Sequence, residues 1–471
     1  MGSPLALRPV NGHGTALRAS VVPTTHRLGD AAGVLMLVVV LAYLLPERLI
    51  VTDMASVGRP AMLAAQLLAM WWGLTRLHPA LATSGRQPVR WVLGCYLVTL
   101  LLGYASGQIR GLSILEQNGA NRAMLAALAF AGVALLAADG ISNRQRLDAV
   151  LRTLTAAAAV MALIGIGQFV LQRDFTEFIS VPPLLTFQAP PVGFSPRGAG
   201  GLFRVAGTTG HYIEFSVLLA MLLPLAIHYA KFAPDRLHRQ LYAGMIVVMT
   251  LAVPLSLSRT GILALFVALA VMAPAWSWRA RLNAAVVAVA LTVALNAIRP
   301  GLIGTLRSLL LNTENDPSII GRTEDYGVVS PMIAERPWFG RGVGTFLPEL
   351  YLLLDNQWLL TLVSGGIVGL VGLVAIYLTG LGLSVTSYRR AKAAGSARDR
   401  DLAAALAAAV VVAGLSAFTF DALYFSTYAL TVALVVGAAG ALWRLTSAPS
   451  AGQPASEAPT EPGGDRRSDA D

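Results

Sequence analysis

The 471-residue sequence is poor in cysteine, in lysine and in charged residues generally. Its one cysteine, Cys95, excludes an intrachain disulfide and any zinc or iron–sulfur site built on cysteines. Neither of its two lysines, Lys231 and Lys392, ends a Gly-x-x-x-x-Gly-Lys-Ser/Thr loop, so we do not expect nucleotide hydrolysis. The motifs His-Glu-x-x-His and Gly-x-Ser-x-Gly, typical of zinc peptidases and serine hydrolases, are also absent.

The shortage of charge indicates the environment of the chain. Charged residues make up 13% of the sequence and hydrophobic residues 55%, and the mean hydropathy is +0.64. Soluble proteins have about a quarter of their residues charged. One apolar run follows another here, each close to the roughly 20 residues that a helix needs to cross a bilayer. Because lipid offers the backbone no hydrogen-bond partners, and the runs are too long for barrel strands, the sequence predicts an all-α polytopic membrane protein.

We expect about 12 transmembrane helices within a membrane domain over residues 31–444. They are predicted at residues 31–46, 54–73, 89–106, 121–138, 149–171, 212–230, 240–257, 260–276, 282–299, 357–383, 401–420 and 424–443. The first run is too long, and its flanks too polar, for a cleaved signal peptide.

Four segments lie outside these spans in the prediction. Residues 1–30 form a cytoplasmic tail, and residues 445–471, rich in Ser, Ala, Pro, Gly and Asp, form a disordered cytoplasmic tail. Two outer loops are long, at residues 172–210 and 300–356. The second precedes the tenth span and contains aromatics, a helical pattern near residues 322–336 and a glycine turn, so we expect it to be ordered.

Lysine and arginine predict the orientation. With the N-terminus inside, most of the 35 basic residues fall in the cytoplasmic segments, and every short inner loop is basic, as the positive-inside rule requires. Tryptophans such as Trp71, Trp358 and Trp443 fall at span ends, which suits amphipathic rings. Both termini are therefore expected inside. The net charge of +10 has a topological explanation, and no nucleic-acid partner is expected.

Several outer arginines have no topological explanation: Arg204, Arg259, Arg322, Arg336 and Arg341 lie in or beside the two long loops or in the Ser-Arg turn. A guanidinium is a fixed fork of donors that matches phosphate oxygens. A group of arginines at the outer interface would suit a diphosphate whose lipid tail stays in the bilayer. The alternative is that they bind lipid headgroups or extend to the interface.

Two polar groups are candidates for proton transfer. His211 and Glu214 are three residues apart at the start of the sixth span, so on a helix they share a face. A carboxylate there would raise the imidazole pKa and prepare a general base, or the two could form a structural pair that caps the span. Asp355 and Asn356 stand at the entry to the tenth span, where they could form a helix cap, or act as a base or as a ligand for the acceptor sugar.

A third acidic group resembles a metal site. Asp399-Arg400-Asp401 has the Asp-x-Asp pattern that holds a metal in nucleotide-sugar transferases. It lies in a basic inner loop, which favours solvated charge. We therefore expect no metal and no other cofactor.

These residues resemble the O-antigen ligase and Wzy-type polymerase family of bacterial envelope glycan enzymes. The resemblance extends over about residues 30–444 and is carried by four stretches. They are Gly207–Phe215, Leu257–Gly261, Gly321–Thr323 with Glu335–Phe346, and Asp355–Gln357 with Gly365–Leu370. The third is the most specific, and the Ser-Arg turn alone would be weak.

The resemblance implies a metal-independent glycosyltransferase in the bacterial plasma (inner) membrane, with its site facing outside. Such enzymes move a glycan from undecaprenyl diphosphate to the hydroxyl of an acceptor glycan or lipid. The family's diphosphate-binding arginines match Arg259 and Arg322, and Arg204 precedes the Gly-Thr segment similarly; Arg341 is a further candidate. Ligases similar to the lipopolysaccharide enzymes carry a His-Asn pair before the tenth span. Asp355 stands at that His position, so either Asp355 or His211 is the base.

A transporter, such as a lipid-linked oligosaccharide flippase, is the competing class. Carriers place charges deep in several spans around a midplane cavity. Here the span interiors are nearly free of charge and the polar residues gather at the outer face, which favours surface chemistry. A scaffold for envelope assembly has little support beyond the basic inner loops and the tail.

Overall fold

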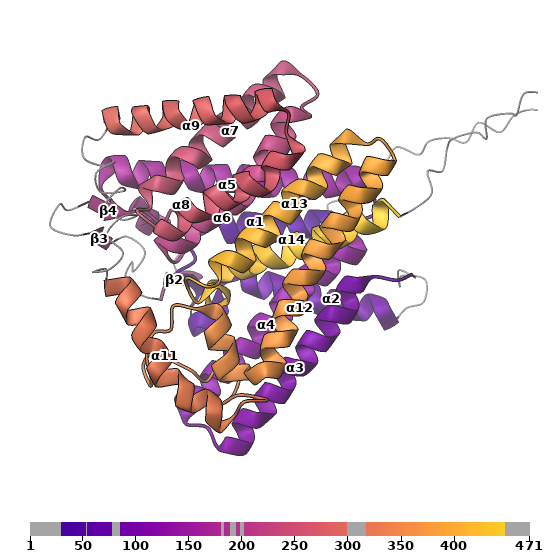
Figure 1. The fold of residues 1–471 in the computed structure, drawn as a ribbon. Helices are drawn as coiled ribbons and strands as arrows, with labels where there is room; N and C mark the ends of the chain where they lie inside the picture. Colours follow the sequence, from indigo (N-terminus) through magenta and orange to yellow (C-terminus); the bar gives the residue numbers. More distant parts are fainter. Residues whose placement is uncertain are drawn as a thin grey trace, which may run out of the picture.

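The computed structural model describes residues 30–52, 54–77, 85–179, 183–188, 195–197, 202–298 and 317–447, with the backbone alone at residues 55–56, 195–197, 202 and 317–324 and at several residues between 280 and 298. Both predicted tails therefore lie almost wholly outside the described residues, as does the first part of the loop 300–356. Figure 1 shows a bundle of helices that run side by side between two ends.

The described residues form helices joined mostly by short connections. The helices are α1 (Ala31–Leu44), η1 (Ala55–Gly58), α2 (Pro60–Leu77), α3 (Pro88–Arg110), α4 (Ile114–Gly140), α5 (Arg144–Leu171), η2 (Phe175–Phe178), α6 (Tyr212–Lys231), α7 (Arg236–Leu255), α8 (Arg259–Met272), η3 (Ala273–Ala275), α9 (Trp278–Ile298), α11 (Pro317–Glu335), α12 (Gln357–Ala393), α13 (Ala397–Ser416), η4 (Ala422–Tyr424) and α14 (Ser426–Leu445).

The membrane prediction is confirmed at the level of fold class. Within the described residues, six helices are long and apolar enough to cross a bilayer, namely α3, α4, α5, α6, α12 and α14, and two shorter apolar helices lie at Ala31–Leu44 and Arg259–Ala275. The protein is thus an all-α, multi-pass membrane protein. A helix overlaps each of the twelve predicted spans, although the number that crosses the membrane stays a prediction.

Polar side chains define where several helices begin. Asp30, Ser113, Asn143, Asp235 and Ser396 each accept a hydrogen bond from a backbone N–H of the first turn that follows. These first-turn N–H groups have no partner inside the helix. The caps explain why the helices start sharply beside the short connections.

The centre of the bundle is formed by α6, α13 and α14. Four-fifths of the apolar stretch of α6 and of α14 is buried, and α13 packs against α6, α8 and α12. The α13 sequence from Asp401 to Val412 is almost entirely alanine, leucine and valine, and all of it except Val411 is buried. Small side chains let helix backbones approach closely. Such close packing drives helix association in lipid, where no hydrophobic effect acts between helices.

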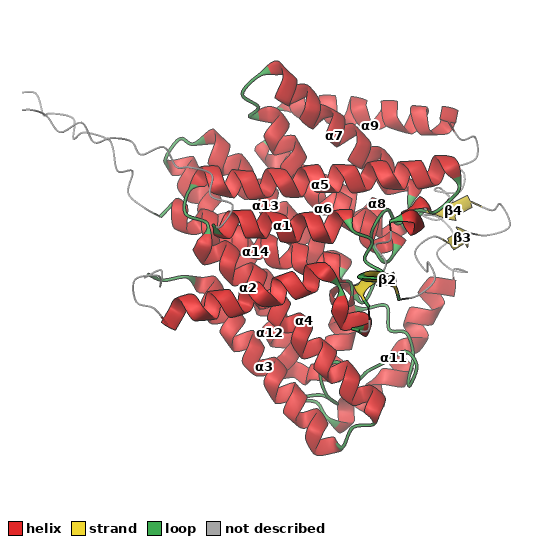
Figure 2. Cartoon of the chain, turned by 180° about the vertical axis from the view of Figure 1, so that it is seen from behind, coloured by secondary structure: helices red, strands yellow, loops and turns green. Residues whose placement is uncertain are grey.

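One end of the bundle carries the strands and the long loops, as Figures 1 and 2 show. We call it the loop end; its described residues are 45–52, 54–59, 172–179, 183–188, 195–197, 202–211, 256–258 and 417–425. Two antiparallel pairs lie there, β1 (Leu49–Val51) with β2 (Leu185–Phe187) and β3 (Ser195–Arg197) with β4 (Leu202–Arg204). By the positive-inside rule this is the predicted outer end.

The opposite end carries the predicted inner loops, and its arginines are paired with buried aspartates. Asp139 accepts hydrogen bonds from Arg90 at 2.8 Å and from the Trp72 indole at 2.9 Å. Asp148 accepts from Tyr229 and from Arg398, both at 2.9 Å. The basic residues of this end therefore also fasten neighbouring helices together.

The interpretation of Asp399-Arg400-Asp401 as solvated charge was wrong for Asp401. Its side chain is 2% exposed, and it accepts hydrogen bonds from the buried His228 at 2.9 Å and from Lys231 at 2.5 Å. Asp399 is paired with Arg144 at 2.7 Å. A buried carboxylate needs such partners, and they join the ends of α6, α5 and α13.

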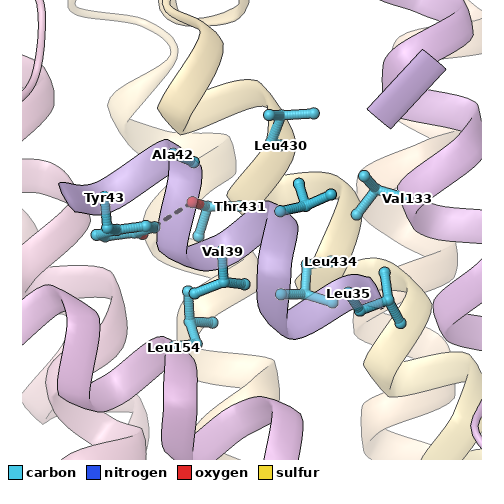
Figure 3. Close-up of a pocket in the computed structure, with 10 residues that line it drawn as sticks. Leu35, Val39, Ala42, Tyr43, Val133, Leu154, Leu430, Thr431 and Leu434 are labelled. Carbon is cyan, nitrogen blue, oxygen red and sulfur yellow. Dashed lines mark hydrogen bonds between the residues drawn. The ribbon is translucent and has the colours of Figure 1, made fainter. Parts of the chain in front are cut away.

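A small pocket lies between α1, α4, α5 and α14 (Figure 3). Aliphatic side chains such as Leu35, Val39 and Leu434 line it, and one polar pair, Tyr43 and Thr431, is hydrogen-bonded within it at 2.8 Å. The pocket has no charged lining residue. It is a packing gap in the apolar core and is distinct from the polar groups of the loop end.

Candidate functional site

Several elements of the loop end contact the connection between α13 and α14, residues 417–425. The backbone N–H of Gln357, the first residue of α12, donates to the carbonyls of Ala417 at 2.8 Å and Phe420 at 3.1 Å. The Leu423 N–H donates in turn to the side chain of Gln357 at 2.8 Å. These bonds fix the start of α12, which follows Asp355 and Asn356, against the connection.

This contact brings Asp355 close to Asp421, a residue that sequence analysis missed. Both side chains are half-buried. Burial and, second, the charge of Asp355 raise the pKa of Asp421 from 3.8 to about 7. Two carboxylates that share a site do not both ionise readily. The loop end thus holds a carboxyl pair that retains a proton close to neutral pH.

Asn356 rather than Asp355 caps α12. The Asn356 side-chain oxygen accepts a hydrogen bond from the Leu359 N–H at 3.1 Å, which satisfies a donor of the first turn. The expected alternatives for this dipeptide therefore fall on different residues. Asn356 carries the structural role, and the carboxylate of Asp355 is not required for it.

The predicted segment before α6 meets the same connection. The His211 ring lies 5.7 Å from the Phe425 ring and 4.0 Å from the Tyr212 ring, between ring centroids. His211 Nδ1 accepts a hydrogen bond from the Ile213 N–H at 3.3 Å, so His211 caps α6. The structure therefore places His211 and Asp355 around one connection although 144 positions separate them in the chain.

The surroundings of His211 differ from the prediction. Burial and then the positive charge of Arg204 lower the pKa of His211 from 6.5 to about 4, and the opposite effect of Glu47 is smaller. We expected a neighbouring carboxylate to raise this pKa. His211 is neutral at neutral pH in this environment and has little tendency to take up a proton.

Glu214 pairs with Glu47 instead of His211. Glu214 is fully buried, and it accepts hydrogen bonds from the N–H groups of Gly210 at 3.1 Å and Tyr428 at 3.0 Å. Glu47 is 6% exposed and accepts from the same Gly210 N–H at 2.8 Å and from Ser426 at 2.6 Å. The two carboxyls link the ends of α1, α6 and α14, which is the structural capping role that the sequence left open.

Arg59 supports this acidic pair from the start of α2. Its guanidinium lies 3.4 Å from a Glu47 oxygen. Burial alone would raise the pKa of Glu47, but the Arg59 charge and the hydrogen bonds lower it below the usual value. Glu47 is therefore ionised, and Arg59 balances its charge beside Glu214. Sequence analysis named neither Glu47 nor Arg59, because Glu47 is an isolated charge at the end of one predicted span and Arg59 an isolated charge near the start of the next.

Arg204 and Arg259 approach the same region from different elements. Arg204, at the end of β4, donates a hydrogen bond to the Tyr212 hydroxyl, and its guanidinium lies 4.4 Å from the centre of that ring. Arg259 is the first residue of α8 and is half-buried. Its α8 backbone lies against α6, since a Cβ on Gly261 would come within 2.3 Å of Ser216.

The turn before Arg259 has an unusual backbone. Leu257 is fully buried and has a positive φ of 51°, a conformation that costs a branched side chain about 1 kcal/mol or more. Ser258 follows and caps α8 by accepting from the Gly261 N–H at 3.3 Å. Backbone strain of this kind persists only where the surrounding structure holds it, and here it fixes the position of Arg259.

The two arginines of the second long loop have different surroundings. Arg322 lies in α11, and its side chain is outside the described residues. Arg341 is paired with Glu335 at 3.0 Å, and its guanidinium lies 5.6 Å from the Tyr351 ring. Its carbonyl accepts a hydrogen bond from Arg110 at 2.9 Å. Arg341 is thus already engaged within the loop, which weakens its case as a ligand for diphosphate.

The most specific motif of the sequence packs into a break in α12. Gly366 has a φ of 65°, and the helix is interrupted there. The Ile367 and Val368 N–H groups donate to the carbonyls of Pro337 at 2.8 Å and Trp338 at 3.1 Å. The Arg341 N–H donates to the Val363 carbonyl at 3.0 Å. Residues 337–342 therefore replace the missing helical hydrogen bonds and hold the outer part of α12.

Acidic residues of the loop end do not form a metal centre in the part of the chain that is described. Within those residues, no three His, Cys, Asp or Glu side chains lie close enough together to hold a metal ion. The polar groups instead form two sets around the connection 417–425: the carboxyl pair Asp355–Asp421, and the group of His211 and Arg204.

The fold and the site define a class of protein. It is an all-helical, multi-pass membrane protein with a group of polar side chains at its loop end. Residues 244–374 match the family model described as O-Antigen ligase. This segment is similar to the O-antigen ligase family, and the resemblance found in the sequence is confirmed there. The match includes Arg259, α11, the break in α12 and Asp355. A search of curated proteins gave no match.

Proposed function

We propose that the protein transfers a glycan from undecaprenyl diphosphate to an acceptor hydroxyl at the outer face of the bacterial plasma membrane. The O-antigen ligase domain supports glycan transfer of the ligase or polymerase type. The observation that carries the proposal further is the convergence of Asp355, Asp421, His211 and Arg204 on the connection 417–425.

In this proposal arginines bind the donor. Arg259, on the strained turn before α8, and Arg322, in α11, hold the diphosphate, with Arg204 beside them. Bidentate guanidinium groups neutralise the diphosphate as the bond to the sugar breaks. This supplies the charge stabilisation that other glycosyltransferases obtain from a metal ion, so the reaction is metal-independent. Arg341 is not used for donor binding in this proposal, because it is already paired with Glu335.

The carboxyl pair activates the acceptor. Asp355 takes the proton of the acceptor hydroxyl as its oxygen attacks the anomeric carbon of the donor sugar. The bond between that carbon and the diphosphate oxygen breaks, and undecaprenyl diphosphate leaves with the electron pair. Asp421 keeps its proton near neutral pH, which favours the ionised form of the neighbouring Asp355 as the base. Asp355 is favoured as the base over His211, whose pKa is lowered to about 4.

Transfer by the purified full-length protein in lipid nanodiscs tests these assignments. The donor is a synthetic polyprenyl-diphosphate disaccharide, and release of polyprenyl diphosphate is measured. We expect Asp355→Asn and Arg322→Ala to lose at least about a hundredfold in rate, the size of one general-base or charge-stabilising contribution. Arg341→Ala is the matched control and should retain most activity. Wild-type rates in both test variants would exclude the proposal.

Cells that lack the gene separate this function from transport. If transfer is lost, undecaprenyl-linked saccharides accumulate after they have reached the outer face, where an impermeant label modifies them. Accumulation on the inner face would mean that the protein moves lipid-linked saccharides across the membrane, and the transferase assignment would fail.

A further inference from the structure

Tyr424 is a large exposed side chain in the connection 417–425, which also carries Asp421. It ends η4, the short helix that directly follows Asp421, and 59% of its surface is exposed. Its backbone N–H donates to the Asp421 carbonyl at 2.9 Å. The Tyr424 backbone is therefore held on the same turn as the Asp421 carboxyl.

The ring of Tyr424 is also supported by its neighbours. Its centroid lies 6.0 Å from that of Phe425 at an angle of 84°, an edge-to-face contact. Phe425 is packed in turn 5.7 Å from Phe420 and 5.7 Å from His211. A row of rings thus extends from His211 through Phe425 to Tyr424, and it supports the exposed Tyr424 ring on the turn that follows Asp421.

We propose that Tyr424 is the platform on which the acceptor sugar stacks, and that the acceptor is a pyranose-containing saccharide. One face of a pyranose ring presents C–H groups, and the negative face of an aromatic ring attracts them. The hydroxyls at the sugar rim then point sideways, toward the neighbouring carboxyls. Tyrosine suits this position because its ring buries apolar area at low entropic cost and its hydroxyl stays in water.

This inference rests on the proposed function, in which Asp355 activates an acceptor hydroxyl, and it adds the chemical class of the acceptor. The alternative role for an exposed tyrosine at this end is an anchor at the membrane interface. Phe418 is the matched control for that role. It belongs to the same connection and is 54% exposed, but its ring contacts Trp358 at 5.6 Å rather than the Asp421 turn.

Saturation-transfer-difference NMR on the full-length protein in nanodiscs tests the platform without any turnover. The probes are methyl β-D-glucopyranoside, methyl N-acetyl-β-D-glucosaminide and methyl α-D-mannopyranoside, with glycerol as a polyol that has no ring. We expect magnetisation transfer to the protons of one face of at least one pyranoside. Tyr424→Ala should weaken that binding about tenfold, the size of one aromatic stacking contact. Tyr424→Phe and Phe418→Ala should retain it.

Three results would overturn the inference: equal signals from wild type and Tyr424→Ala, including no signal from either; an equal loss in Phe418→Ala; or equal transfer to glycerol. Asp355→Asn separates this failure from that of the proposed function. An Asp355→Asn variant that is inactive in transfer, together with a Tyr424→Ala variant that binds like wild type, would remove the platform alone. Wild-type transfer by Asp355→Asn would remove the catalytic proposal, whatever the binding result.

Discussion

Replacing Asp421 with asparagine tests the carboxyl pair through stability. Burial and then the Asp355 charge raise the pKa of Asp421 in the folded protein from 3.8 to about 7. Because the folded pKa lies above the unfolded value, the folded state binds a proton that the unfolded chain has released. The free energy of unfolding therefore decreases as pH rises from about 4 to about 7. Full ionisation costs roughly 4 kcal/mol, an upper limit because the side chain is half-buried and solvent screens part of the charge.

Thermal unfolding of the nanodisc-embedded protein between about pH 5 and about pH 8 measures this effect. We expect the wild-type midpoint to fall across that window and the Asp421→Asn midpoint to stay nearly level, so that the variant is the more stable protein at the upper end. Asp355→Asn should reduce the slope as well, since it removes the repelling charge. The control is Asp235→Asn: Asp235 is exposed at the opposite end, and its pKa is lowered by hydrogen bonds from His238, so the slope should remain. Parallel curves for wild type and Asp421→Asn would refute the reasoning.

The remaining predictions concern the donor site, the cap and the break in α12. Arg259→Ala should abolish transfer and Arg259→Lys should restore little, since lysine is a point charge; comparable rates for both and wild type would contradict the diphosphate role. His211→Asn should keep most activity because asparagine is also a good cap, and an inactive but folded variant would return His211 to the role of base. Gly366→Ala should destabilise the protein by about 1–3 kcal/mol, because a Cβ at this position would lie 2.3 Å from the Trp338 carbonyl oxygen. The thermal unfolding midpoint should therefore be lower, and an unchanged midpoint would argue against the packed break.

Helix positions were predictable because an apolar run must be long enough for its helix to cross the bilayer. Helices such as α6 and α14 overlap closely with their predicted spans, at residues 212–230 and 424–443. The helix predicted near residues 322–336 is also present, as α11 (Pro317–Glu335). The length of a helix, its apolar pattern and the residues that bound it are local properties of the sequence, so no knowledge of the packing was needed to predict them.

The partners of charged residues were not predictable in the same way. Asp401 looked like solvated charge because its sequence neighbours are basic, yet His228 and Lys231, on another helix, enclose it. His211 and Glu214 are three residues apart in the sequence, but the Glu214 side chain interacts with that of Glu47, which lies more than 160 positions earlier. Asp421 carried no motif at all. Its pairing with Asp355 follows from hydrogen bonds between Gln357 and the connection 417–425.

The sequence by itself determined the membrane class, the helix positions, the family resemblance and the residues that belong to its motifs, because each of these is written in composition, period or local pattern. Tertiary structure decided which of those residues meet. It placed His211 and Asp355 around one connection, engaged Arg341 within its own loop, and gave Asp355 a carboxyl partner. The physical reason is that electrostatic effects depend on distance and burial, and both arise only when helices from distant parts of the chain pack together.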